Sequence, residues 1–120
     1  MTDINQWIDN EVKTNDVVLF MKGTPEQPAC GNSLRALQAL WGAGAPITAV
    51  NVLPDPQIRQ ELSALSDWPT IPQVFVKGEL IGGADITEEL FESGALRSKL
   101  DDALGAAREQ VVKVVELELG

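Results

Sequence analysis

The sequence predicts one α/β domain whose helices and strands follow the order α-βαβα-ββ-αα. The chain has 120 residues, enough for one domain and too few for a two-domain enzyme. Apolar residues make up 44% of it, which is sufficient for a hydrophobic core and excludes wholesale disorder. Along the chain, apolar residues alternate between helical spacing and short strand-like runs, and this alternation predicts the element order.

The first part of the chain predicts a helix, a strand and a second helix. Apolar residues recur at helical spacing over residues 4–12, after Thr2-Asp3, which suits an N-cap. Val17 to Met21 is a continuous apolar run, typical of a central strand covered on both faces. Residues 23–28 are rich in Gly and Pro and predict a loop, and residues 33–43 predict an amphipathic helix.

The middle of the chain predicts a strand, a helix and a hairpin. Ile47 to Leu53 is rich in β-branched residues and predicts the second strand. Asp55 and Pro56 suit the N-cap and first position of the following helix. The tight turn signal Lys77-Gly78-Glu79 separates two short apolar runs, so residues 74–81 predict two antiparallel strands.

Two further helices and a tail complete the chain. Asp85 with Glu88 resembles a capping box that starts one helix, and Ser93-Gly94 separates it from another that begins near Leu96. We therefore expect a main domain over residues 1–105 and an accessory C-terminal tail over residues 106–120. Val111 to Leu119 has the composition of a strand but no evident partner.

Charge and composition exclude several classes of function. The net charge is -9 and the isoelectric point near 4.3, the wrong sign for binding a phosphate backbone, so we expect no nucleic-acid partner. Without His and with one Cys, a single chain cannot assemble a Ser/His/Asp triad or an all-protein zinc site. A lone Cys and the lack of a signal-like or membrane-spanning run favour a cytoplasmic protein, or a processed organellar form, with no membrane partner.

Cys30 is the candidate reactive group. It lies between the Gly/Pro loop and a predicted helix, where backbone N–H groups at the helix start stabilise a thiolate. The alternative is a buried structural Cys. Ser33 stands where a Cys-x-x-Cys pair would have its second Cys, so thiol exchange between two cysteines of one chain is impossible.

Other residues suit the binding of a small zwitterionic peptide. Lys22 and Arg59 could hold a carboxylate, although solvated surface charges are the alternative for both. Gly82 to Asp85 offers bare backbone at a helix start, with a carboxylate for an ammonium group; an ordinary turn with an N-cap is equally consistent. Ile71-Pro72 is a candidate cis peptide bond whose Ile71 backbone could pair with an extended peptide, against an ordinary loop proline.

These residues together resemble the monothiol glutaredoxins of the Cys-Gly-Phe-Ser class. The resemblance covers roughly residues 4 to 104, with its motifs in the family's order and spacing. The motifs are Met21-Lys22-Gly23-Thr24-Pro25, Cys30-Gly31, Ser33, Trp68-Pro69-Thr70-Ile71-Pro72-Gln73, Val76-Lys77-Gly78-Glu79 and Ile81-Gly82-Gly83.

The resemblance implies a thioredoxin-like fold with a four-stranded mixed sheet flanked by helices, and glutathione as the ligand. Lys22 and Arg59 would hold its glycyl carboxylate, and Ile71, before the cis proline Pro72, would pair with its cysteinyl backbone. The γ-glutamyl end would lie against Gly83, Ala84 and Asp85. Cys30 would be the catalytic thiol or the ligand of a [2Fe-2S] cluster, which two chains and two glutathione molecules share in this family.

Two positions depart from the family pattern. Asn32 replaces the usual Phe beside the thiol, and Ala84 stands where many members have a second Cys. The implied function is a cluster-bridged homodimer that passes [2Fe-2S] clusters to apo iron-sulfur proteins. Glutathione-dependent thiol-disulfide exchange, which removes glutathione from proteins, is the enzymatic alternative and is favoured by Asn32. A module that regulates a partner through its surface is a third interpretation.

Overall fold

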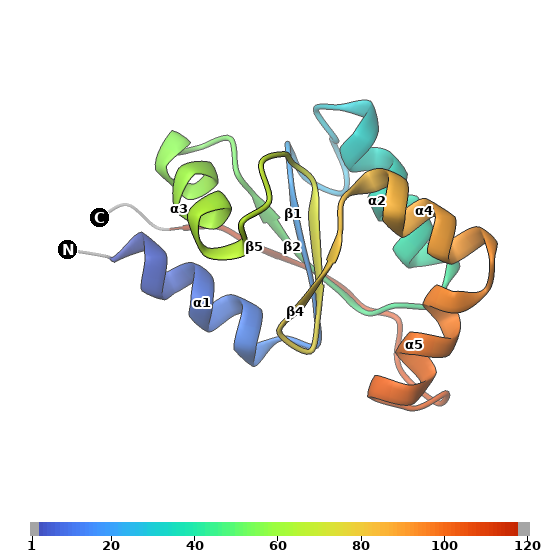
Figure 1. The fold of residues 1–120 in the computed structure, drawn as a ribbon. Coiled ribbons are helices and arrows are strands. Elements are labelled where there is room, and N and C mark those ends of the chain that lie inside the picture. The colour runs from blue at the N-terminus through green and yellow to red at the C-terminus, as the bar shows by residue number, and fades with distance from the viewer. Residues whose placement is uncertain (1–2, 118–120) are drawn as a thin grey trace.

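The computed structural model describes residues 3–117 and forms a five-stranded sheet between two layers of helices (Figure 1). In chain order the elements are α1 (Ile4–Thr14), β1 (Val17–Met21), α2 (Gly31–Gly42), β2 (Ile47–Asn51), α3 (Pro56–Ser66), β3 (Gln73–Val76), β4 (Glu79–Gly82), α4 (Ala84–Glu92), α5 (Ala95–Leu104) and β5 (Val112–Val115). Within residues 3–117, no helix is long and apolar enough to cross a membrane.

The sheet is mixed, with strand order β4-β3-β1-β2-β5. Strand β1 runs parallel to β2 and antiparallel to β3, β3 pairs antiparallel with β4, and β2 pairs parallel with β5. The family's thioredoxin-like arrangement of sheet and flanking helices is confirmed, but the sheet has a fifth strand beyond the four expected.

Strand β1 supplies both hydrophobic cores, because all five of its residues are buried and successive side chains point to opposite faces. Val17, Leu19 and Met21 join the core under α2 and α5. Val18 and Phe20 join the second core, under α1 and α3. In Figure 1, α1 and α3 accordingly lie on one side of the sheet and α2, α4 and α5 on the other.

Local sequence signals determine where α1 and α3 begin and where the chain turns between β3 and β4. Asp3 caps α1 by accepting from the N–H of Gln6, while Thr2, the other half of the predicted cap, lies outside the described residues. Asp55 caps α3, with Pro56 in its first turn. The hairpin turn at Lys77 and Gly78 has positive φ angles of 50° and 80°, as a type I′ turn requires.

The expectation that the C-terminal strand has no partner was wrong. Strand β5 adds to the open edge of β2, and the pairing begins where the N–H of Ile47 donates to the carbonyl of Val111 at 2.8 Å. The predicted tail of residues 106–120 thus extends the sheet through its described part, while residues 118–120 lie outside the described residues. Sequence patterns reveal a strand but not which free edge accepts it.

Arg108 fixes the loop between α5 and β5. Its guanidinium donates to the carbonyls of Ala43 and Gly44 at 2.9 Å each and of Gly105 at 2.8 Å, and it pairs with Asp101. The side chain is 8% exposed. These contacts tie the loop to the carbonyl end of α2, where unpaired C=O groups need donors.

We predict that Arg108→Ala lowers the free energy of unfolding by roughly 1 to 3 kcal/mol, because it leaves the Asp101 carboxylate and three carbonyls, including that of buried Ala43, without their donor. Urea unfolding would measure the change. Arg97→Ala is the matched control, since Arg97 is exposed and makes a single bond to the same helix end, to the carbonyl of Gly42. Equal, small effects of both substitutions would contradict the anchoring role of Arg108.

Candidate functional site

The predicted site residues gather at one edge of the sheet. Strands β1 and β2 are parallel and end there at Met21 and Asn51. Strand β3 is antiparallel to β1 and begins there, with Gln73 opposite Phe20, and β4 ends there at Gly82. The loops attached to these four strand ends, in the upper part of Figure 1, therefore lie near one another.

Cys30 is the N-cap of α2, so the helix starts two residues before the predicted Ser33. Its Sγ accepts from the N–H of Ser33 at 3.4 Å and lies 3.5 Å from the Ser33 Oγ. Ser33 is fully buried, and its Oγ accepts from the N–H of Lys22 at 3.0 Å. One hydroxyl thereby links the thiol to the end of β1.

These contacts set the acidity of the thiol. Partial burial, the largest single influence, raises the pKa of Cys30, whereas hydrogen bonds from the side chain and backbone of Ser33 lower it. The backbone of Asn32 and the charge of Lys22 add to the lowering, so the pKa lies below its ordinary value. This is the expected environment of a reactive cysteine and disfavours the structural alternative.

The loop that carries Cys30 is held in place by backbone contacts. The N–H of Ala29 donates to the carbonyl of Lys22 at 2.8 Å, and the N–H of Gly23 donates to the Asn51 Oδ1 at 3.0 Å. Gly23 has a φ of +88°, and a Cβ there would lie 2.4 Å from the carbonyl oxygen of Gln27. Only glycine fits this turn, which brings Cys30 back beside the end of β1.

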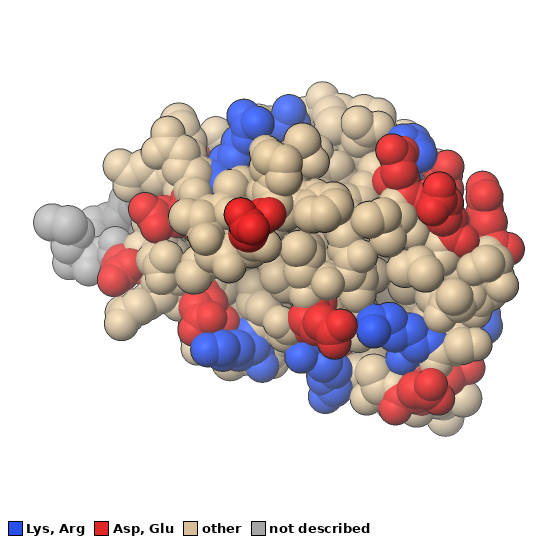
Figure 2. Space-filling view, in the orientation of Figure 1, with Lys and Arg blue, Asp and Glu red and all other residues tan. Residues whose placement is uncertain are grey.

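Lys22, which directly follows β1, and Arg59, within α3, line the same hollow. The hollow is completed by Val52, Leu53, Pro56, Gln60 and Ser63. Two cationic side chains in a partly apolar hollow suit the binding of a carboxylate. The space-filling view shows a small group of basic side chains at the upper edge of the molecule (Figure 2), whose net charge is -9.

The other predicted binding residues line a second pocket, of about 310 Å³. Its lining is Asn32, Trp68, Thr70, Ile71, Pro72, Gly83, Ala84, Asp85 and Ile86. The Ile71-Pro72 peptide bond is cis, as proposed from the sequence. A Cβ on Gly83 would lie 3.3 Å from the Pro72 carbonyl oxygen, so a glycine there lets α4 start close against this loop.

The side chain of Gln73 holds the loop that lines the second pocket, a role that the sequence did not suggest. Its side chain is fully buried, and its Nε2 donates to the carbonyls of Trp68 at 3.0 Å and Thr70 at 3.2 Å. The loop before the cis proline is therefore tied to the first residue of β3.

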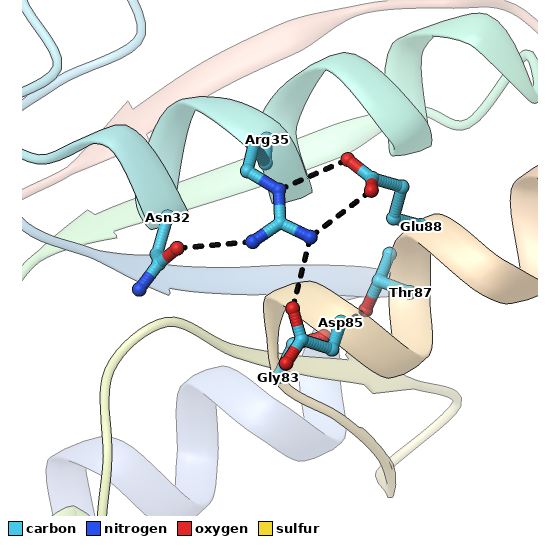
Figure 3. A network of polar contacts seen from close by, with 6 residues as sticks. All are labelled: Asn32, Arg35, Gly83, Asp85, Thr87 and Glu88. Atoms are coloured by element: carbon cyan, nitrogen blue, oxygen red, sulfur yellow. Dashed lines mark hydrogen bonds and ion pairs between the residues drawn. The ribbon is translucent and has the colours of Figure 1, made fainter.

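The predicted capping box at the start of α4 is wrong. The N-cap is Gly83, and no side chain among residues 3–117 caps the helix. Instead, Asp85 and Glu88 both bind Arg35 of α2, at 2.9 and 3.0 Å, and Asn32 accepts from the same guanidinium at 3.1 Å (Figure 3). Arg35 was missed because its partners are 50 and 53 residues away in the chain. Hydrogen bonding to Arg35 lowers the pKa of Glu88.

The chain is similar in sequence to known proteins. A glutaredoxin family profile matches residues 17–81. The chain is 52% identical over 89 residues to a Legionella pneumophila protein named "Probable monothiol glutaredoxin GrlA", covering 74% of this chain and all of that one.

Solved structures are similar over most of the chain. Reduced apo GrxS14 from poplar aligns with a TM-score of 0.74 at 42% identity, over 84% of this chain and 93% of that one. A buckwheat glutaredoxin solved as a complex with glutathione aligns with a TM-score of 0.74 at 25% identity, over 87% of this chain and 93% of that one.

We predict that Ser33→Ala raises the pKa of Cys30, because it removes the largest interaction that favours the thiolate. The pH dependence of iodoacetamide alkylation would measure this, since only the thiolate reacts. The alkylation midpoint should move to higher pH, and the rate at neutral pH should fall. Ser98→Ala, on an exposed position of α5, is the control. An unchanged pH profile of alkylation in Ser33→Ala would contradict the role of Ser33 in lowering the pKa of Cys30.

Proposed function

Because the chain belongs to the monothiol glutaredoxins, we propose that it is a glutathione-dependent carrier of [2Fe-2S] clusters, active as a cluster-bridged homodimer. The observation that carries the proposal is the single cysteine of the chain, which lies at the N-terminus of α2 and has a lowered pKa. Two pockets are lined by residues near it in the chain, one by Lys22 and the other by Asn32. The predicted site residues all precede residue 106, so we assign this function to residues 1–105.

The two pockets suit the two ends of glutathione. Lys22 and Arg59 would bind its glycyl carboxylate in one pocket. Gly83, Ala84 and Asp85 would bind the γ-glutamyl end in the other, where α4 begins with N–H groups that no side chain caps. Ile71, beside Pro72, would pair with the cysteinyl backbone between them. The glutathione thiol would then lie next to Cys30.

The number of thiols leads to the dimer. A [2Fe-2S] cluster held by thiolates needs four of them, and each chain has one Cys. Two chains and two glutathione molecules supply that number. The cluster is cargo in this proposal, and it passes by ligand exchange to an apo iron-sulfur protein that offers its own thiolates. A reducing compartment such as the cytoplasm keeps Cys30 available.

Thiol-disulfide exchange is the competing function, and Asn32 favours it because an exposed amide replaces the family's bulky Phe beside the thiol. The Cys30 thiolate would attack the glutathione sulfur of a mixed disulfide and release the protein thiolate. A second glutathione thiolate would then attack the glutathione bound to Cys30, forming glutathione disulfide and restoring the Cys30 thiolate.

We predict that replacing Lys22 or Arg59 by Ala weakens glutathione binding by roughly 1 to 3 kcal/mol, the usual worth of a charge-assisted hydrogen bond. Titration calorimetry would measure the affinity. Lys77→Ala is the control, because Lys77 lies at the opposite end of β3 and pairs with Asp16. Unchanged affinity in both site variants would show that Lys22 and Arg59 are solvated surface charges and do not bind glutathione.

We further predict that cluster assembly needs Cys30 and glutathione together. Anaerobic reconstitution with iron, sulfide and glutathione should give a coloured dimer, followed by visible absorption and size-exclusion chromatography. Cys30→Ser, or omission of glutathione and all other small thiols, should give a colourless monomer. A full cluster in either of these preparations would disprove the shared-ligand mechanism. A colourless wild-type monomer that rapidly removes glutathione from a mixed disulfide would favour the exchange function instead.

A further inference from the structure

Four polar side chains form a network between α2 and α4, at the rim of the pocket that contains Asn32 and Asp85. Arg35 is its centre (Figure 3). The guanidinium binds both carboxylate oxygens of Glu88 at 3.0 Å, the Oδ1 of Asp85 at 2.9 Å and the Oδ1 of Asn32 at 3.1 Å. The Arg35 side chain is 36% exposed and the Asp85 side chain 83% exposed, so solvent reaches both of them.

The network fixes which atoms of Asn32 and Asp85 face the ligand. An amide has one acceptor and two donor hydrogens, and the acceptor of Asn32 is occupied by Arg35. Figure 3 shows the Asn32 nitrogen turned away from the guanidinium. Neither this nitrogen nor the Oδ2 of Asp85 makes a hydrogen bond or ion pair within residues 3–117. The pocket therefore presents an amide donor and a carboxylate acceptor.

The charge balance favours a cation at the carboxylate. One guanidinium faces the two carboxylates of Asp85 and Glu88, so one negative charge remains uncompensated. In Figure 2, acidic side chains likewise dominate the surface over α2 and α4. An ammonium group beside the Oδ2 of Asp85 would neutralise the remaining charge, and a carboxylate would accept from the Asn32 amide.

We infer that Asn32 is a specificity-determining residue whose amide N–H donates a hydrogen bond to the α-carboxylate of a γ-glutamyl group. Arg35 is then the positioning residue that orients the side chains of Asn32 and Asp85. This inference rests on the proposed function, because it concerns how the glutathione pocket recognises the γ-glutamyl end of the ligand. The substitution of Phe by Asn beside the thiol then adds a polar contact to the ligand where the family pattern has an aromatic ring.

The test compares glutathione with two analogues, each lacking one charged group of the γ-glutamyl end. Glutaryl-cysteinylglycine lacks the α-ammonium, and γ-aminobutyryl-cysteinylglycine lacks the α-carboxylate. Asn32→Ala should weaken glutathione and the glutaryl peptide by about tenfold and leave the γ-aminobutyryl peptide unchanged, because only that peptide lacks the group that Asn32 binds. Asp85→Asn should show the opposite selectivity. Gln38→Ala, exposed on the same helix, is the control.

Arg35→Gln separates positioning from mere structural support. The unaltered protein should prefer glutathione over both analogues, and this variant should lose the preference. A variant that unfolds more easily but keeps the preference would show that Arg35 only joins α2 to α4. Equal effects of Asn32→Ala on all three peptides, or none, would overturn the role of Asn32 while leaving glutathione binding intact. If the unaltered protein binds none of the peptides, the proposed function fails and this inference fails with it.

Discussion

The site depends on the pairing of β1 with a parallel neighbour on one side and an antiparallel neighbour on the other. Because β1 and β2 run together, their carboxyl ends meet, and because β3 runs the other way, its beginning meets them. Full burial of β1 on both faces leaves little freedom to shift this register, since a one-residue slip would exchange the two cores. The loop with the thiol, the cis proline loop and the start of α4 are thereby brought to one place by backbone topology.

Side chains then refine what the topology places. Ser33 connects the thiol to the end of β1, Gln73 holds the cis proline loop, and Asn51 holds the loop that carries Cys30. Each is a polar side chain that binds backbone groups of the loops next to strand ends, where the sheet does not satisfy them. Of the three, Ser33 both lowers the pKa of Cys30 and satisfies a backbone N–H of the fold.

Sequence patterns predicted what depends on near neighbours in the chain. The five-residue run of β1, the Asp55-Pro56 start of α3 and the Lys77-Gly78 turn were all found as expected. The partner of β5 and the network of Arg35 were not, because each depends on a residue more than fifty positions away that no local spacing reveals. The capping-box pattern at Asp85 was misleading for the same reason: a distant guanidinium binds both of its carboxylates.

The fifth strand also changes which strand forms the free edge of the sheet. Without it, β2 would expose a row of unpaired backbone groups beside the apolar residues Ile47, Ala49 and Val50, an edge that invites strand-by-strand aggregation. With it, the outermost strand on that side has four residues, carries Lys113 and is followed by Glu116. Short edge strands with charged side chains resist such stacking. The described part of the tail thus replaces the β2 edge with a four-residue strand that carries one charged side chain and also exposes Val112 and Val114.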